Sequence, residues 1–220
     1  MLKAVIFDMD GVISDSERLY VDIKRKTLET LGIYHIPDEY HMKFIGTTHE
    51  YQWNIMNKEF HIEHISAETY LETLYAIKDR VFRETSIGPI RGVVEFIDAL
   101  KQAGYPLAVA SSSTIREIKD MLDSLGIADR FDTLASGWEV EHGKPAPDIY
   151  LKASQGLGVE PEHCMVIEDA PNGAIGAKAA GMFCLGFSNM DYPMSNMKEA
   201  DEVFTQYQDI SVTYCENLMK

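Results

Sequence analysis

A short apolar run that leads directly into two aspartates constrains this chain more than any other feature. Residues 4–7 (Ala-Val-Ile-Phe) lack polar and apolar alternation, which predicts a strand buried on both faces of a parallel sheet. Such strands end where open α/β folds bind their ligands. Asp8 and Asp10 follow at once, and residues two apart on an extended chain point the same way. We therefore expect both carboxylates in one pocket with a cation between them, although an ordinary polar turn at Gly11 is the alternative.

Composition disfavours several classes of partner. The chain has 220 residues and a net charge of −15, so nucleic acid and anionic membranes, which both require basic surface, are not expected. No signal peptide precedes the first strand, and no apolar run approaches the length of a membrane span. Cys164, Cys184 and Cys215 are scattered and odd in number, which argues against a disulfide framework or a metal cluster. We expect a cytoplasmic protein and a monomer.

The periodicity of apolar residues changes twice along the chain. Helices are predicted at 16–31, 49–60 and 66–84, and no convincing strand lies between 15 and 87. Strands are predicted at 106–110, 133–135, 165–167, 183–187 and 202–204, alternating with helices at 92–104, 115–125, 147–156 and 172–180. This alternation predicts a parallel sheet with helices on both faces. Residues 1–14 and 88–220 would form this α/β core, and 15–87 a helical insertion at its carboxyl edge, where a lid would lie.

A cluster of hydroxyl groups follows the strand predicted at 106–110. Ser111, Ser112, Ser113 and Thr114 lie at a strand–helix junction, where hydroxyls and backbone N–H groups can bind a phosphate. Helix capping by Ser113 or Thr114 explains part of this cluster, but not three consecutive serines.

Two later segments add charged groups at the same edge. Lys144 lies between Gly143 and Pro145 and could direct its ammonium at a phosphate or at the carboxylates, although a solvated lysine is the alternative. Glu168 and Asp169 end the strand predicted at 165–167. Two strands that deliver paired acids to one edge favour Mg²⁺, which binds through few carboxylates and keeps several waters.

Taken together, these segments resemble the four motifs of the haloacid dehalogenase-like superfamily in order and spacing: Asp8-Met9-Asp10-Gly11-Val12, Ser111, Lys144-Pro145 and Glu168-Asp169. The resemblance covers essentially the whole chain and is closest to the β-phosphoglucomutase/phosphatase branch of subclass I. It implies a Rossmann-like three-layer core with a central parallel sheet, and an inserted α-helical cap domain formed by residues 15–87.

The resemblance also implies roles for individual residues. Asp8 would be the nucleophile that forms an aspartyl-phosphate, and Asp10 would protonate the leaving oxygen and then activate water. Ser111 and Lys144 would hold the phosphoryl oxygens. Mg²⁺ would be bound by Asp8, the Asp10 backbone carbonyl and Asp169, with Glu168 close by or acting through water. The implied activity is Mg²⁺-dependent hydrolysis of a small phosphorylated metabolite, such as a sugar phosphate.

Substrate binding is expected from both domains, at Ser111, Ser112, Lys144, Asn172, Tyr20, Thr48 and His49. The β-phosphoglucomutases carry a cap histidine and a cap arginine, where this chain has Tyr20 and His49, so a phosphatase is favoured over the alternative, a sugar-phosphate mutase. The aromatic run 51–53 is expected to line the substrate side of the cap, with a place in the cap core as the alternative for Tyr20 and Trp53. The remaining cap histidines show no zinc spacing and are expected on the surface or in packing.

Overall fold

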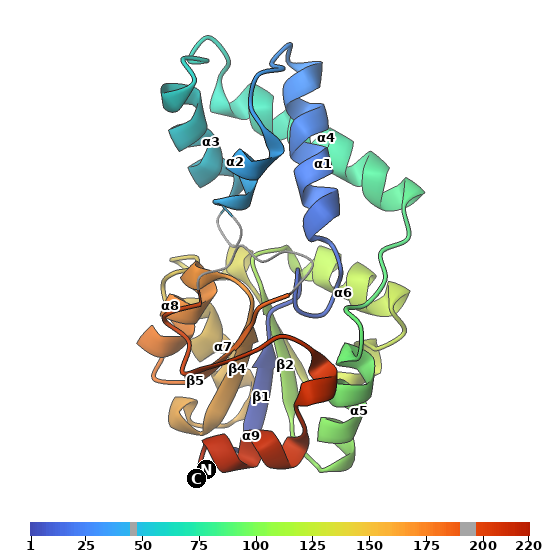
Figure 1. The fold of residues 1–220 in the computed structure, drawn as a ribbon, viewed down its shortest axis with the longest axis vertical. Helices are drawn as coiled ribbons and strands as arrows, with labels where there is room; N and C mark the ends of the chain where they lie inside the picture. The colour runs from blue at the N-terminus through green and yellow to red at the C-terminus, as the bar shows by residue number, and fades with distance from the viewer. Residues whose placement is uncertain (45–47, 190–196) are drawn as a thin grey trace. The chain divides into compact units, whose positions relative to one another are not determined.

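The chain folds into two compact units. The computed structural model describes residues 1–44, 48–189 and 197–220. One unit combines Met1–Asp15 with Gly88–Lys220, and the other is the continuous segment Ser16–Ile87 (Figure 1). We call them the core unit and the inserted unit and describe each by itself.

The core unit is built on a parallel sheet of six strands. These are β1 (Ala4–Phe7), β2 (Leu107–Ser111), β3 (Thr133–Ser136), β4 (Cys164–Glu168), β5 (Phe183–Phe187) and β6 (Glu202–Phe204). Their order is β3-β2-β1-β4-β5-β6, and every neighbouring pair is parallel. The predicted α/β fold with a Rossmann-like parallel sheet is therefore confirmed.

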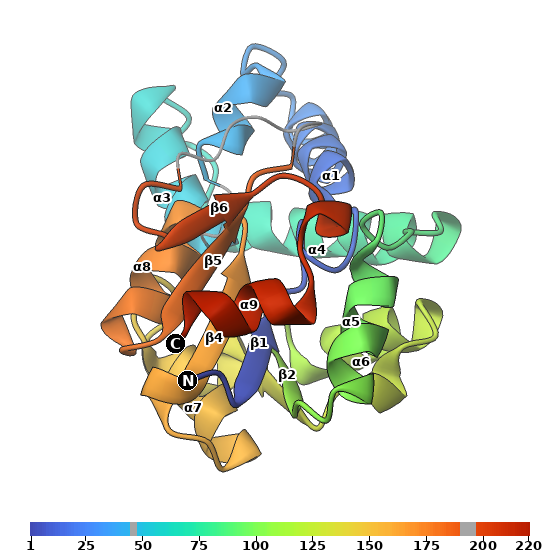
Figure 2. The ribbon, with the colours of Figure 1, turned by 60° about the horizontal axis from the view of Figure 1, so that its bottom comes forward.

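Helices connect the strands and cover the sheet. They are α5 (Val93–Gln102), α6 (Ile115–Ser124), α7 (Asp148–Leu157), α8 (Pro171–Ala179) and α9 (Val212–Leu218). Short 3₁₀ helices lie at Ala128–Arg130, Gly137–Glu139, Pro161–His163 and Tyr207–Asp209. Figure 2 shows α9, which sequence analysis did not predict, lying across the sheet in front of β1 and β4.

Alternate residues of β1 face opposite layers, as a strand buried on both sides requires. All four residues of β1 are 0% exposed. Ala4 and Ile6 belong to a core cluster that includes α7 and α8 residues such as Ile149 and Ala177. The Phe7 ring points the other way and contacts Phe96 of α5, with ring centroids 6.4 Å apart. Burial on both faces explains why this run is uniformly apolar.

The strand order reverses between β1 and β4, and this reversal marks where a ligand can bind. The chain proceeds outward from β1 through β2 to β3, then returns to β4 on the other side of β1. In open α/β sheets, the crevice beyond the carboxyl ends of strands at such a reversal is the usual ligand site. Asp8 follows β1 and Glu168 ends β4, so the two acid pairs flank the reversal.

The described residues of the inserted unit form four helices: α1 (Glu17–Thr30), α2 (Asp38–Met42), α3 (His49–Glu59) and α4 (Ala67–Glu84). No strand occurs among the residues of this unit that the structure describes. An apolar cluster holds the helices together, and at its centre the rings of Trp53 and Tyr70 stack 4.2 Å apart. Trp53 is 0% exposed, so its expected place on the substrate side is wrong and the core alternative holds. The short helix α2 was not predicted.

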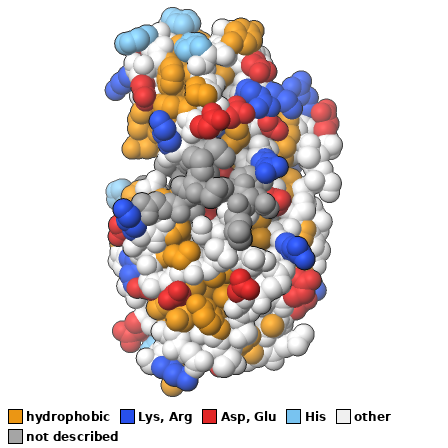
Figure 3. All heavy atoms as spheres, viewed as in Figure 1, with side chains coloured by type: hydrophobic (Ala, Val, Ile, Leu, Met, Phe, Trp, Pro, Cys, Tyr) orange, Lys and Arg blue, Asp and Glu red, His pale blue; other side chains and the backbone are white. Residues whose placement is uncertain are grey.

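Among the described residues, no helix is both long enough and apolar enough to cross a bilayer. Acidic and basic side chains are interspersed over the face shown in Figure 3, so the excess of acidic residues does not form one uniform patch there.

Candidate active site

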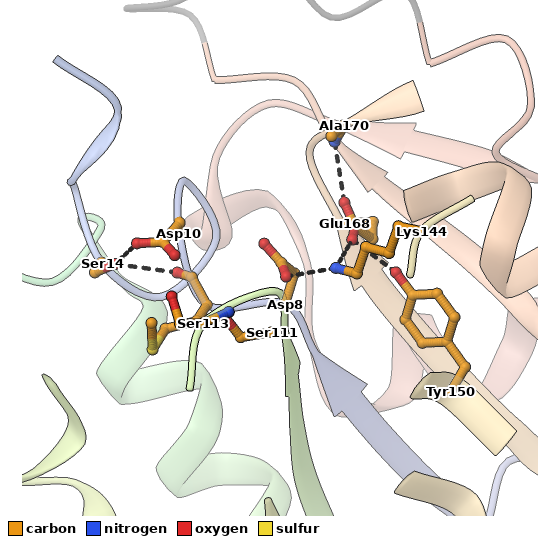
Figure 4. A network of polar contacts seen from close by, with 10 residues as sticks. Asp8, Asp10, Ser14, Ser111, Ser113, Lys144, Tyr150, Glu168 and Ala170 are labelled. Carbon is orange, nitrogen blue, oxygen red and sulfur yellow. Dashed lines mark hydrogen bonds and ion pairs between the residues drawn. The ribbon is translucent and has the colours of Figure 1, made fainter. Parts of the chain in front are cut away.

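Asp8 lies at the carboxyl end of β1, in a polar network of Asp8, Lys144, Glu168 and Asp169 that we call the acid network. Its backbone N–H donates to the Ile167 carbonyl at 2.9 Å, which extends the pairing of β1 with β4 by one residue. The residue is only 8% exposed. Figure 4 shows its carboxylate between the loop that carries Asp10 and the side chains of Lys144 and Glu168.

Lys144 forms ion pairs with two of the candidate acids. Its Nζ donates to Asp8 Oδ1 at 2.6 Å and also to Glu168 Oε1. The Lys144 side chain is 3% exposed, so the alternative of a solvated lysine is wrong. The glycine–lysine–proline segment therefore brings the Lys144 ammonium to both acids, although Lys144 is 24 residues from Glu168 and 136 residues from Asp8 along the chain.

Donors from three elements hold the Glu168 carboxylate. Oε1 accepts from Lys144 and from the Tyr150 hydroxyl at 2.7 Å, and Oε2 accepts from the Ala170 N–H at 3.1 Å (Figure 4). The carboxylate also lies directly against Gly173 near the start of α8, where any added Cβ would overlap it. Only glycine therefore allows α8 to approach this acid so closely.

Burial sets the protonation behaviour of the site. Loss of solvent raises the pKa of Asp8 to about 8; Lys144 opposes this rise, whereas Glu168 and Asp10 add to it. Burial alone would lower the pKa of Lys144, but its two carboxylate partners raise it above the usual value. The pKa of the Tyr150 phenol is raised well above its usual value by burial and by Glu168, so this hydroxyl remains a donor.

Three buried carboxylates could hold a cation. One oxygen each from Asp8, Glu168 and Asp169 lie within 4.8 Å of one another. When ionised, the carboxylates of Asp8, Glu168 and Asp169 carry more negative charge than the Lys144 ammonium offsets. Hard oxygen donors with this charge excess fit Mg²⁺.

The loop with Asp10 is fixed by bonds to its own backbone. The Met9 carbonyl accepts from the N–H groups of Ile13 and Ser14 at 2.8 and 2.9 Å and from the Ser14 hydroxyl at 3.2 Å. Ser14 Oγ also lies 3.5 Å from Asp10 Oδ1. Gly11 has φ of 78°, a conformation that glycine adopts without strain. Tyr207, which sequence analysis missed, anchors the loop by donating to the Val12 carbonyl at 3.1 Å.

The hydroxyl residues that follow β2, Ser111 to Thr114, have separate roles. Ser111 ends β2 and is 1% exposed, and its Oγ accepts from the Ser113 N–H at 3.1 Å (Figure 4). Thr114, not Ser113, caps α6 by a reciprocal pair of bonds with Glu117. Ser112 is exposed, and its backbone lies close to Gly137. Asn172 is half-buried in the first turn of α8.

The inserted unit brings two of the three predicted substrate residues together. The rings of Tyr20 and His49 have centroids 6.2 Å apart, and His49 also contacts Tyr75 at 6.0 Å. Lys78, which was not predicted, places its Nζ 5.4 Å from the Tyr20 ring centroid although the residue is 6% exposed. We call Tyr20, His49, Tyr75 and Lys78 the ring–lysine patch. Thr48 is exposed and caps α3 by accepting from the Tyr51 N–H.

The other histidines of the inserted unit follow the expected surface and packing roles. His35, His61 and His64 are exposed. His41 is 0% exposed and its Nδ1 lies 2.8 Å from Gln52 Nε2.

Besides Tyr207, three residues that shape these sites were not predicted from the sequence, although each of the three left a signal. Tyr150 puts a polar tip on the buried face of a helix, and a buried phenol normally requires a partner. Gly173 stands near the start of a helix, where glycine is unfavourable unless another group approaches closely. Lys78 occupies a position on α4 next to apolar Ile77 and Leu74, on a mostly buried face.

Comparisons with known proteins agree with this arrangement. A family model described as haloacid dehalogenase-like hydrolase matches residues 5–187. The phosphorylated carbohydrates phosphatase of Thermotoga maritima is 35% identical over 181 residues, which cover 82% of each chain. Hexitol phosphatase B of Escherichia coli (strain K12) is 30% identical over 190 residues, covering 82% of this chain and 81% of that protein.

A solved structure resembles the whole chain. The β-phosphoglucomutase of Clostridium difficile superposes with a TM-score of 0.81 at 25% identity, covering 100% of this chain and 97% of that one.

Proposed function

The chain belongs to the haloacid dehalogenase-like hydrolase family and is a phosphatase, and we propose that it hydrolyses small phosphorylated carbohydrates through a phosphorylated Asp8 in an Mg²⁺-dependent reaction. The motif resemblance drawn from the sequence is thereby confirmed at the level of the family. The arrangement of Lys144 between Asp8 and Glu168, with Asp169 beside them, carries the mechanistic proposal.

Mg²⁺ would be held by Asp8 and Asp169, with Glu168 as a further ligand or a partner through water and the Asp10 backbone carbonyl completing the set. When bound, the cation would neutralise charge on the transferring phosphoryl group. Lys144 would remain as the second positive charge, because its ion pairs keep it protonated.

Asp8 and Asp10 divide the covalent chemistry between them. Asp8 attacks phosphorus and displaces the alcohol, and Asp10 protonates the leaving oxygen. Water activated by Asp10 then attacks the phosphorus of the aspartyl-phosphate and regenerates the Asp8 carboxylate. Splitting the reaction in this way suits phosphate monoesters, whose uncatalysed hydrolysis is exceptionally slow.

Ser111 and Lys144 would bind the phosphoryl oxygens. The Ser111 hydroxyl accepts from the Ser113 N–H, so its own proton can be donated to a phosphoryl oxygen. Two preorganised donors directed at the oxygens where negative charge develops stabilise the transition state without reorganisation. Ser112 and Asn172 remain candidates for contacts further from phosphorus.

The ring–lysine patch and Thr48 would contact the organic part of the substrate. Tyr20 and His49 offer flat faces and polar edges for a carbohydrate, and Lys78 adds a positive charge. The names of the relatives, a phosphorylated carbohydrates phosphatase and a hexitol phosphatase, support this substrate class.

Phosphate release from a panel of phosphorylated sugars and sugar alcohols tests the proposal. We expect Mg²⁺-dependent release that chelation abolishes and Mg²⁺ restores. A panel that includes phosphorylated amino acids and nucleotides serves as the control for substrate class. Equal rates across all classes, or release that chelation does not alter, would contradict the proposal.

A sugar-phosphate mutase is the second candidate, because the β-phosphoglucomutase similarity spans the whole chain. Incubation with β-glucose 1-phosphate and traces of the 1,6-bisphosphate separates the two. Release of phosphate supports the phosphatase, whereas glucose 6-phosphate formed without released phosphate would establish the mutase.

A further inference from the structure

Tyr150 contacts the acid network through a hydrogen bond to Glu168. It comes from α7, the helix that follows the lysine segment, and is 0% exposed. Its hydroxyl donates to Glu168 Oε1 at 2.7 Å, the same oxygen that accepts from Lys144 (Figure 4). The phenol therefore joins a continuous chain of contacts from α7 through Glu168 and Lys144 to Asp8.

The ring of Tyr150 is held independently of its hydroxyl. Lys144 Nζ lies 5.3 Å from the ring centroid. On another side, a Cβ at Gly176 of α8 would lie only 3.0 Å from Tyr150 Cε2, so the ring packs closely against that backbone. Because these contacts fix the ring, they also fix the direction of the hydroxyl. A phenylalanine would keep the packing and lose only the hydrogen bond.

The hydroxyl completes the set of donors around Glu168. Lys144 and Tyr150 share Oε1, the Ala170 N–H takes Oε2, and Gly173 closes the remaining side. Without the phenol, Oε1 would keep Lys144 but lose Tyr150 as a donor. The carboxylate could then turn toward the ammonium. That rotation would draw Lys144 away from Asp8.

We propose that Tyr150 is a positioning residue that acts through Glu168: its hydroxyl fixes the carboxylate, and the carboxylate in turn directs Lys144 at Asp8. This inference rests on the proposed function for its kinetic consequence. Groups that orient the immediate partners of a metal or phosphoryl site typically change affinity or activity by about 10- to 100-fold when removed.

Tyr150→Phe is the test, and Tyr105→Phe is its matched control. Tyr105 also donates its phenol to a glutamate, Glu216, at 2.8 Å in the core unit, but neither residue belongs to the acid network. Both variants lose one phenol–carboxylate hydrogen bond, so a purely structural role predicts similar effects on function.

We expect Tyr150→Phe to lower kcat by about 10-fold or more and to weaken Mg²⁺ binding, measured by calorimetry without substrate, by about the same factor. KM should change less than kcat, because the substrate's organic part is bound elsewhere. Tyr105→Phe should stay within about twofold of the wild type in both measurements. Indistinguishable values for the two variants would overturn the proposal.

A double-mutant cycle with Glu168→Gln tests whether Tyr150 acts through Glu168. If it does, Tyr150→Phe adds little further loss of kcat in the Glu168→Gln background. Full additivity of the two losses would show an independent role and would contradict the proposal.

The two proposals fail in distinguishable ways. Absence of phosphatase activity in the wild type would refute the proposed function, but the calorimetric comparison of Tyr150→Phe with Tyr105→Phe would still decide the role of Tyr150. Normal wild-type activity with unchanged Mg²⁺ affinity and kcat in Tyr150→Phe would refute the positioning role alone.

Discussion

The acid network of the core unit and the ring–lysine patch of the inserted unit hold their polar groups in different ways. In the core unit, Glu168 has donors on both oxygens and Lys144 bridges two carboxylates. In the inserted unit, Lys78 lies over an aromatic ring, and the buried Trp53 Nε1 and Tyr70 hydroxyl have no hydrogen-bond partner among the described residues.

This difference separates chemistry from selectivity. More than one bond determines the position of Glu168 and of Lys144, so a single substitution there should disturb the reaction itself. The contacts of the patch include ring packing between Tyr20, His49 and Tyr75, and substitutions there should alter which substrate binds.

Lys144→Met should have the largest effect. It leaves Asp8 and Glu168 as buried carboxylates without their shared ammonium, which typically destabilises a protein by about 3–5 kcal/mol. Loss of a donor to the transferring group should lower kcat by about 10²- to 10³-fold. Steady-state kinetics and urea unfolding measure the two effects.

The control is Lys152→Met, which breaks a half-exposed ion pair with Glu139 in the same unit. It should change stability by about 1 kcal/mol or less and leave kcat unaltered. Equal losses of kcat and of stability in the two lysine variants would contradict the claim that Lys144 matters more than a lysine in a surface ion pair.

His41 should make the inserted unit sensitive to acid. Burial, with a smaller contribution from Lys24, lowers the pKa of His41 from 6.5 to about 4. The folded state thus favours the neutral His41 ring. The contribution of this preference to the free energy of unfolding is fully present above pH 6.5 and is lost as pH falls through 4. The free energy of unfolding falls by about 3 kcal/mol in total through this titration.

Urea unfolding of wild type and His41→Gln at a series of pH values measures this contribution. The stability advantage of the wild type should shrink between neutral pH and pH 4. Parallel pH profiles for the two proteins would show that His41 does not titrate in this range. Asp38 and Arg25, which also act on His41, are present in both proteins.

His49→Ala should have the smallest effect and should act on binding. We expect KM for the preferred carbohydrate phosphate to rise by about 10-fold with kcat nearly unchanged, because a contact made equally in substrate and transition state is lost. Turnover of p-nitrophenyl phosphate should change little. His64→Ala, an exposed histidine of the same unit, is the control. A fall in kcat with both substrates would place His49 in the chemistry instead.

The same contrast explains how much the sequence could predict. Parallel strands bring their carboxyl ends to one edge, so Asp8, Ser111 and Glu168 could be expected together although they are far apart in the chain. Lys144 could be expected there from its place between the strands. The sequence indicates only that the Tyr150 hydroxyl needs a partner; which partner it has could not be predicted, because the contact depends on how α7 packs against α8.

The inserted unit offered no comparable rule. Helix α2 of this unit is too short for a periodic pattern, as is the seven-residue α9 of the core unit. Trp53 and His49 lie on the same helix, and only packing against Tyr70 decided that the tryptophan is core. Lys78 became a candidate only because Tyr20 lies beneath its ammonium.

The most direct test of the mechanism is the turnover of p-nitrophenyl phosphate by Asp8→Asn, alongside its thermal unfolding. Asparagine keeps an oxygen that can accept from Lys144 but is a far weaker nucleophile than a carboxylate. The account predicts that the variant folds and releases no p-nitrophenol above the buffer control. A folded variant that turns over at the wild-type rate would contradict the assignment of Asp8 as the nucleophile.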